Sequence, residues 1–157
     1  MKIRKVNSDD CETLFTWAND PQVTNFRLNP KTIQWDEHCQ WFKSKLSDEN
    51  AFMYMYQTDE NIPAGQVRFD IEDDERAVIS VSLSSDHRNK GLGVQLIKEG
   101  IRLFLKESKV KKIMAIIRDG NAASINAFTK AGFVLLNQET INGNLCGKYI
   151  LNQESLN

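Results

Sequence analysis

A six-residue segment, Arg88-Asn89-Lys90-Gly91-Leu92-Gly93, constrains the fold of this chain more than any other part of the sequence. It follows an alternating apolar run at 77–83 and precedes an amphipathic stretch at 94–107, which predicts a strand, a tight turn and a helix. The first N–H groups of a helix lack partners within it, and the helix dipole favours an anion there. The two glycines let a phosphate approach the main chain, while Arg88 and Lys90 add positive charge. The segment therefore predicts a phosphate-binding site.

The spacing of these glycines excludes two common phosphate-binding motifs. No glycine begins a G-x-x-x-x-G-K-[ST] loop, and a dinucleotide fingerprint would need a third glycine where the sequence has Leu96. The R-x-x-G-x-G pattern resembles the pyrophosphate loop of the GNAT acetyltransferases, which binds the pyrophosphate of acetyl-coenzyme A. A helix N-terminus with a solvated basic turn is the other interpretation of the six residues taken alone.

A second segment carries the same resemblance. The run Asn121-Ala-Ala-Ser-Ile-Asn-Ala-Phe-x-x-x-Gly-Phe133 follows a β-branched stretch at 112–117 and has helical spacing over 122–130. It is similar to the GNAT segment that closes the cofactor cleft. In that family the asparagine at the Asn121 position hydrogen-bonds the pantetheine arm, and the residue at the Ser124 position often contacts the cofactor. With both segments in the expected order, the chain is identified as a member of the family.

The remaining pattern predicts an α/β fold. The expected elements are a strand at 3–6, helices at 14–18 and 32–46, strands at 52–57, 65–71 and 77–83, a helix at 94–107, a strand at 112–117, a helix at 122–130, a strand from 133 and a last strand at 147–151. The segment 22–31 is expected to be irregular, and the acidic tip 72–75 to be a solvated turn rather than a metal site. This order gives a mixed, mostly antiparallel central sheet flanked by helices, which is also the GNAT-type acyl-CoA acyltransferase fold that the resemblance implies.

Composition and charge are those of an ordinary enzyme domain. The chain has 157 residues and a formal net charge of −1, which argues against a general binder of nucleic acid or of anionic membranes. Its cysteines, Cys11, Cys39 and Cys146, lack paired spacing, which indicates reduced thiols. Because no apolar run has membrane-spanning length and the N-terminus lacks a signal-peptide core, we expect one cytoplasmic domain at 1–151 with a polar tail at 152–157. A homodimer is compatible with the sequence, and no metal is expected.

The resemblance assigns the cofactor site residue by residue. Backbone groups of Val81, Ser82 and Leu83 would bind the pantetheine arm, and an N–H near Leu83 would polarise the thioester carbonyl as an oxyanion donor. The loop from Arg88 to Gly93, together with the Asn121 and Ser124 positions, would hold the rest of acetyl-CoA. One residue departs from the family: the usual tyrosine seven residues after the asparagine is Phe128 here, which cannot donate a proton to the leaving thiolate.

Acetyl transfer to an amine requires the amine to be neutral, so a base or an ordered water must accept its proton. The candidate bases are Asp70 at the end of its strand, and Glu37 and His38 on the second helix. His38 would titrate near neutral pH. The alternative interpretations are a surface pair for Glu37 and His38, and a polar strand cap for Asp70.

Three segments of the N-terminal half bear on the acceptor: Trp17-Ala-Asn-Asp-Pro21, Ile33-x-Trp35-x-Glu-His-x-x-Trp41-Phe42 and Gly65-Gln-Val-Arg68-Phe-Asp70. They resemble the GNAT enzymes that acetylate the 4-amino group of nucleotide-linked amino sugars on the route to pseudaminic and related nonulosonic acids. Trp17, Trp35 and Trp41 could stack on a sugar or a base, whereas Arg27 and Arg68 could hold a diphosphate. Core packing is the alternative for the tryptophans. The spacing from Leu14 favours it for Trp17, whereas Trp35, beside the irregular segment, is the favoured ligand contact.

Other functions stay open at this point. RimJ/RimL-like acetylation of a protein N-terminus fits the same W-x-N-D-P helix ending, and a polyamine acceptor would need acidic residues, which here cluster at 72–75. A non-catalytic acyl-CoA-binding module is supported only by Phe128. The sequence therefore predicts an acetyl-CoA-dependent N-acetyltransferase of a small-molecule amine, with an amino-sugar nucleotide as the favoured acceptor.

Overall fold

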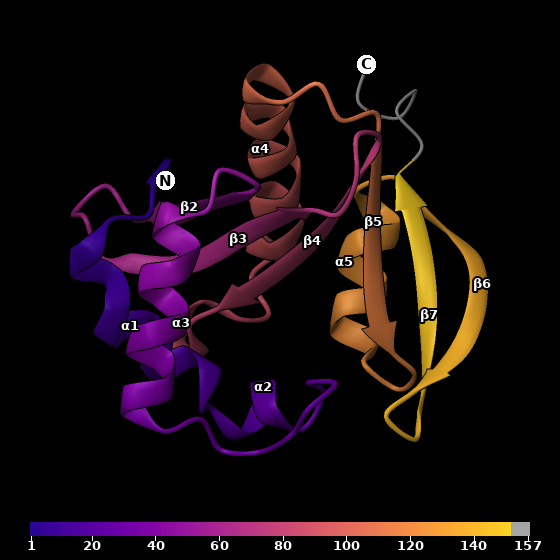
Figure 1. Ribbon diagram of the computed structural model, residues 1–157, viewed down its shortest axis with the longest axis horizontal. Helices are drawn as coiled ribbons and strands as arrows, with labels where there is room; N and C mark the ends of the chain where they lie inside the picture. The colour runs from indigo at the N-terminus through magenta and orange to yellow at the C-terminus, as the bar shows by residue number, and fades with distance from the viewer. Residues whose placement is uncertain (152–157) are drawn as a thin grey trace.

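The computed structural model describes residues 1–151, so the expected polar tail at 152–157 lies outside the described residues (Figure 1). Its strands are β1 (Lys2–Lys5), β2 (Ala51–Gln57), β3 (Pro63–Ile71), β4 (Arg76–Leu83), β5 (Lys112–Arg118), β6 (Phe133–Ile141) and β7 (Asn144–Leu151). Its α-helices are α1 (Cys11–Ala18), α2 (Pro21–Thr24), α3 (Trp35–Ser47), α4 (Leu92–Glu107) and α5 (Ala122–Lys130), with short 3-10 turns at Ser8–Asp10 and Ser85–His87. The strands form a single sheet in the order β1-β2-β3-β4-β5-β7-β6.

The sheet is antiparallel except between β4 and β5, which confirms the mixed, mostly antiparallel architecture. The two parallel strands pair only over Arg76↔Lys112, Ala77↔Ile113 and Val78↔Met114. Beyond Val78 they diverge, and Figure 1 shows β4 and β5 spreading apart toward the end where α2 lies. The main-chain edge of β4 from Ile79 to Leu83 is therefore left without a strand partner.

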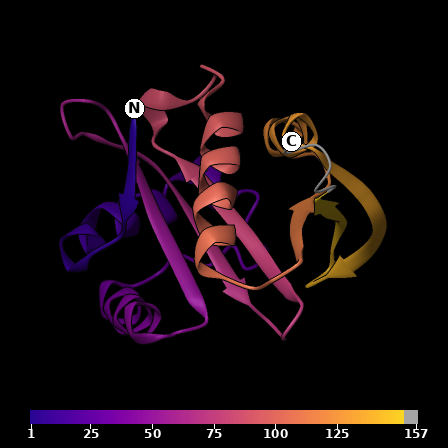
Figure 2. The ribbon, with the colours of Figure 1, turned by 90° about the horizontal axis from the view of Figure 1, so that it is seen from above.

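Helices cover both faces of the sheet. The helix α4 packs on β2, β3 and β4 (Figure 2), where Phe104 stacks on Phe69 with ring centroids 4.2 Å apart. A Cβ at Gly100 would lie 2.6 Å from Val67 Cγ1, so a glycine is needed for α4 to approach β3 this closely. On the other face α1 and α3 bury a smaller apolar cluster that includes Leu14, Phe42 and Met55. The polar side chains of β3 and β4 on that face are then free to line a site.

Three local expectations were wrong. The segment expected to be irregular contains α2, because Asp20 caps the Gln22 N–H at 2.9 Å and Pro21 takes the first helical position, so the Asp-Pro pair starts a helix as well as ending one. The helix α3 begins at Trp35, not at 32. The strand β7 begins at Asn144, because Asn142 and Gly143, at φ of 51° and 79°, make a tight hairpin turn after β6.

The described residues contain neither a membrane-spanning helix nor a cluster of metal ligands. No helix in residues 1–151 is long and apolar enough to span a membrane. Within the same residues no three His, Cys, Asp or Glu side chains gather in a way that could hold a metal ion.

Candidate active site

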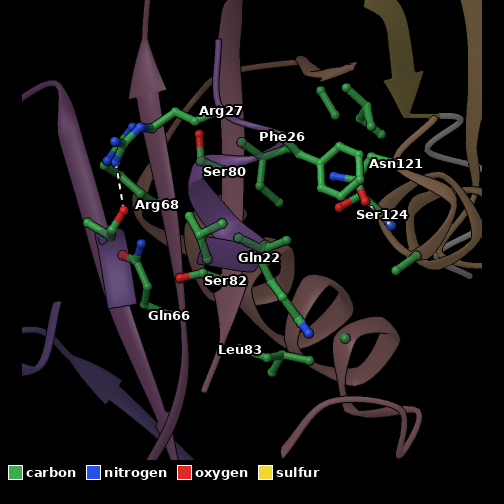
Figure 3. Close-up of a pocket in the computed structure, with 18 of the residues that line it drawn as sticks. Gln22, Phe26, Arg27, Gln66, Arg68, Ser80, Ser82, Leu83, Asn121 and Ser124 are labelled. Carbon is green, nitrogen blue, oxygen red and sulfur yellow. Dashed lines mark hydrogen bonds between the residues drawn. The ribbon is translucent and has the colours of Figure 1, made fainter. Parts of the chain in front are cut away.

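A cavity of about 710 Å³ opens where β4 and β5 diverge (Figure 3). On one side it is lined by the predicted cofactor residues Val81, Ser82, Leu83, Arg88, Gly93, Asn121 and Ser124. On the other side it is lined by the predicted acceptor residues Arg27, Trp41 and Arg68 and the candidate base His38. Residues predicted for the donor and for the acceptor thus meet in one continuous space.

The open edge of β4 presents main-chain groups to this cavity. At one end of the strand the Ser84 N–H donates to Ala64 O on the β3 side, and at the other end the Lys112 N–H donates to Glu75 O on the β5 side. Successive residues of a strand point their N–H and C=O groups to opposite edges. The main-chain N–H and C=O groups of odd-numbered residues in β4 therefore point away from β3. The N–H groups of Val81 and Leu83 are thus directed into the gap beside β5. This geometry fits the predicted oxyanion donor at Leu83.

The glycine-containing loop brings the N-terminus of α4 to the same gap. Asn89 and Gly91 have positive φ angles of 61° and 75°, so the chain reverses tightly before α4 begins at Leu92. A Cβ at Gly93 would lie 3.6 Å from Ala127 Cβ, which places the helix start next to α5. Asn89, Lys90, Gly91 and Leu92 do not line the cavity, so their contact with the cofactor stays a prediction.

Arg88 ties this loop to the N-terminal half of the chain. Its Nη2 lies 3.3 Å from Asp20 Oδ2, and its Nη1 donates to Gln22 Oε1 at 2.9 Å. Residues 20–30, which we call the cover segment, have two further attachments: Arg118 donates to Asn25 O at 2.7 Å and Asn142 to Leu28 O at 3.3 Å. Arg118 lines the cavity and was missed by sequence reasoning, although a basic residue at the end of a buried strand was a usable signal.

Asn121 caps α5, and this structural role is compatible with its predicted hydrogen bond to the pantetheine arm. Its Oδ1 accepts the Ser124 N–H at 3.3 Å and so caps α5. Its Nδ2 has no hydrogen-bond partner among the described residues and can donate to a pantetheine carbonyl. Phe128, seven residues after Asn121, is buried edge-to-face against Phe133 at a centroid distance of 5.1 Å and lines the cavity.

Arg68 is held in place by its neighbours on the acceptor side. Its Nε donates to Asp70 Oδ2 at 2.8 Å, and its guanidinium carbon lies 5.1 Å from the Trp41 ring centroid. Its two terminal nitrogens have no hydrogen-bond partner within residues 1–151. Arg68 therefore presents a fixed guanidinium fork to the cavity.

Asp70 does not line the cavity. Lys45 Nζ donates to its other oxygen at 2.7 Å, so two cations share this carboxylate. Burial opposes ionisation of Asp70, but the charges and hydrogen bonds of Arg68 and Lys45 outweigh it and hold the pKa below its ordinary value. Such a carboxylate is a weak base, and its geometry is that of a group that positions Arg68.

His38 is buried among the rings of α1 and α3. Its Nε2 lies 2.8 Å from Cys11 O, and because a carbonyl can only accept, Nε2 carries the hydrogen and Nδ1 the lone pair. Burial lowers the pKa of His38, partly opposed by the Cys11 hydrogen bond, so the ring is neutral at physiological pH. Of the three candidate bases, His38 is the one that lines the cavity.

The remaining predicted residues lie away from the cavity or are occupied elsewhere. Trp17 packs against the Leu14 and Phe42 cluster, Trp35 packs edge-to-face on Phe15 at 5.1 Å, and Glu37 is exposed. Arg27 does line the cavity, but its guanidinium donates to the carbonyls of Ala18, Asn29 and Lys31. It therefore braces the cover segment with most of its donors.

The charge of the lining is one-sided. Arg27, Arg68, Arg88 and Arg118 line the cavity, and no aspartate or glutamate of residues 1–151 does. Asp20 and Asp70 stand behind two of these arginines as ion-pair partners, but Arg27 and Arg118 bind only backbone carbonyls in the structure. The space between donor and acceptor sides therefore has a positive electrostatic character.

The site combines three features that are expected of an acyl-CoA site: the diverging strands β4 and β5, the glycine loop at the start of α4, and the capped helix α5. Comparison with known proteins identifies the class of enzyme. Residues 1–134 match the family model described as an acetyltransferase (GNAT) domain, so the chain belongs to the GNAT acetyltransferases and is an N-acetyltransferase that uses acetyl-CoA as the donor.

Relatives of known structure or name agree with this assignment. The chain is 23% identical to the acetyltransferase PseH of Campylobacter jejuni over 144 residues, 92% of this chain and 89% of that protein. Its fold is similar to that of spermidine N-acetyltransferase from Vibrio cholerae in complex with CoA and spermine, with a TM-score of 0.86, 17% identity and coverage of 99% and 98% of the two chains. It is also similar to AAC(6')-Ib in complex with ribostamycin and coenzyme A, with a TM-score of 0.84, 18% identity and coverage of 98% and 94%.

Proposed function

We propose that this enzyme transfers the acetyl group to the amine of an acceptor that also carries an anionic group, and that the acceptor is a nucleotide-linked 4-amino sugar. The observation that carries the proposal is the cavity lining, which has four arginines and no carboxylate. A nucleotide-linked sugar contains a diphosphate, which arginine binds through paired hydrogen bonds. The segments that resemble amino-sugar nucleotide acetyltransferases, and the similarity to PseH over most of both chains, support the same acceptor.

In this proposal Arg68 has the leading part in recognising the anionic group. Its terminal nitrogens are free, its plane is fixed by Trp41 and its Nε by Asp70, so little side-chain entropy would be lost on binding an anion. Trp41 lines the cavity beside it and offers an aromatic surface for a base or a sugar. Arg27 is a weaker candidate, since three backbone carbonyls already occupy it.

Polycationic acceptors fit this lining poorly. Spermine and ribostamycin are bound by two proteins of similar fold, but fold alone does not transfer an acceptor. Binding a polyamine requires carboxylates to compensate its charges, and the lining residues include none. A protein N-terminus carries a single amine and stays an alternative acceptor of the RimJ/RimL type.

The chain's own residues support acyl transfer as follows. The N–H groups of Val81 and Leu83 point into the gap and would stabilise negative charge on the carbonyl oxygen under attack. His38, neutral and with its lone pair on Nδ1, would take the proton of the amine directly or through a water. Phe128 supplies no proton, so the thiolate leaves without help from that position.

A competition assay tests the acceptor. The purified protein and acetyl-CoA are mixed with equimolar UDP-linked 4-amino-4,6-dideoxy sugar, spermidine, ribostamycin and a short peptide with a free N-terminus, and the products are identified by mass spectrometry. We expect the sugar nucleotide to be acetylated at least ~10-fold faster than the polycations, and UDP to inhibit competitively against it. Preferential acetylation of spermidine or ribostamycin would refute the anionic-acceptor proposal, and acetylation of the peptide alone would favour the RimJ/RimL-type alternative.

A further inference from the structure

A glutamine in the cavity has no role in the site described so far. Gln66 lies on β3 directly opposite Ser82 of β4, and two residues before Arg68, on the acceptor face of the sheet. Figure 3 shows Gln66 and Ser82 on adjacent strands, with Arg68 further along the strand of Gln66. Because Leu83 follows Ser82, this places Gln66 beside the part of β4 whose main chain faces the gap and would face the thioester.

The side-chain amide of Gln66 is incompletely bonded. Its Oε1 is buried and has no hydrogen-bond partner among the described residues. A buried acceptor without a donor is costly, and such groups in native proteins usually have a missing partner. The neighbouring residue on β2 is Met55, which offers no donor to the amide. The last torsion of a glutamine is soft, so a small rotation presents this oxygen to a molecule in the cavity.

We propose that the Gln66 amide is the group that orients the acceptor amine: its Oε1 accepts an N–H hydrogen bond and thereby aims the nitrogen lone pair at the thioester carbon beside Leu83. The proposal rests on the acetyl transfer proposed above. An amide oxygen can accept this bond but cannot take a proton, so Gln66 fixes the direction of attack while deprotonation is left to His38 or water.

The choice of glutamine over glutamate also sets which amines are accepted. A carboxylate at this position would hold an ammonium ion and stabilise its charge, whereas a neutral amide favours an amine that has already lost its proton. With no carboxylate elsewhere in the lining, Gln66 would be a specificity residue against polycations.

The experiment compares the wild type with Gln66→Met, which keeps the length but removes the hydrogen bond, and with Gln66→Glu, which adds a carboxylate. Gln138→Met, at an exposed position of β6 outside the cavity, is the matched control. Each protein is assayed with whichever acceptor of the competition panel the wild type acetylates fastest. Calorimetric affinity for acetyl-CoA and Tm show whether the fold and the donor site are intact.

We expect Gln66→Met to lower kcat/KM for the acceptor by about 5- to 150-fold, as for loss of one hydrogen bond to a buried group, with acetyl-CoA affinity within about twofold of wild type. We expect Gln66→Glu to improve kcat/KM for spermidine relative to an anionic acceptor and to add an ionisation to the pH profile. A Gln66→Met enzyme with kcat/KM like that of the control overturns the proposal, as does an equal loss of acetyl-CoA affinity. If spermidine is the fastest acceptor, the proposed function fails, but the role of Gln66 is still decided on that acceptor.

Discussion

Replacing Asp70 with asparagine distinguishes a positioning residue from a catalytic base. Asp70 holds Lys45 and Arg68 through contacts of 2.7 and 2.8 Å, and each charge-assisted hydrogen bond contributes about 1.5–3 kcal/mol when shielded from water. The three side chains keep between 22% and 28% exposure, so screening reduces this to about 1 kcal/mol for each pair. We therefore expect Asp70→Asn to lower the free energy of unfolding by about 1–2 kcal/mol and Tm by about 2–8 °C.

The kinetic consequence separates the two roles. A positioning role predicts a rise in KM for the acceptor of up to about 10-fold, with kcat nearly unchanged, because Arg68 loses its orientation but the reacting groups stay in place. A general base would cost about 10²–10⁴-fold in kcat. Steady-state kinetics and thermal unfolding are measured together, with Asp59→Asn, an exposed carboxylate paired to the N-terminus, as the control. A kcat loss beyond about 100-fold with an unshifted Tm would refute the reasoning.

The stability difference also has a predictable pH dependence. The pKa of Asp70 is lowered in the folded state, so its carboxylate stabilises the fold fully above the ordinary value of 3.8. This contribution is lost as the pH falls below 3.8 and through the folded-state pKa. The Tm gap between wild type and Asp70→Asn should be constant from neutral pH down to about pH 5 and should close in more acidic buffer. A gap that instead closes near neutral pH would mean that another group is titrating.

Two further substitutions test the donor side. Asp20→Asn keeps the cap on the Gln22 N–H but removes the negative charge that holds Arg88. Because Arg88 is then available to the anionic cofactor, calorimetry should show acetyl-CoA binding up to about 5-fold tighter at low salt. Weaker binding would show that the cover segment must stay attached to Arg88. Gly65→Ala would place its Cβ 2.9 Å from Ser82 O and force β4 to shift, at a cost of about 1–3 kcal/mol. Gly93→Ala meets only ordinary contacts at 3.6 and 3.8 Å and should leave Tm nearly unchanged. Equal Tm values for the two variants would contradict this account of the β3–β4 packing.

The sequence predicted those parts of the fold that local signals determine. The strand, glycine turn and helix around Arg88 were predicted correctly, because alternation, glycine placement and amphipathic spacing lie within a short stretch of chain. The hairpin of β3 and β4 around the acidic tip was also predicted correctly, for the same reason. By contrast, the Asp-Pro pair at 20–21 is a signal both for the end of α1 and for the start of α2, but the sequence pattern was interpreted only as the end of a helix.

The acceptor site was harder to predict because it depends on contacts between distant segments. Arg68 was a candidate from sequence, but its fixation by Lys45, Asp70 and Trp41 needs α3 and β3 side by side. Trp35 was a stacking candidate like Trp41, but it lies about one and two-thirds turns earlier on α3, where it packs against Phe15 and does not line the cavity. Gln66 lies in the segment 65–70 that carries the acceptor resemblance, but the sequence assigned it no role, since an unsatisfied amide is visible only when its surroundings are known.

The alternation of side chains along β3 and β4 explains how one fold can serve different acceptors. The main-chain N–H groups of Val81 and Leu83 face the gap, where we propose that they bind the donor, and this role needs no particular side chain. The side chains of Gln66, Arg68 and Ser80 line the cavity, where we propose that they face the acceptor, and they can change without moving the β4 main chain. Proteins of this fold that are solved with spermine and with ribostamycin are consistent with such a division. It follows that substitutions at 66 and 68 should alter acceptor choice far more than acetyl-CoA affinity, whereas displacing the β4 main chain should impair both.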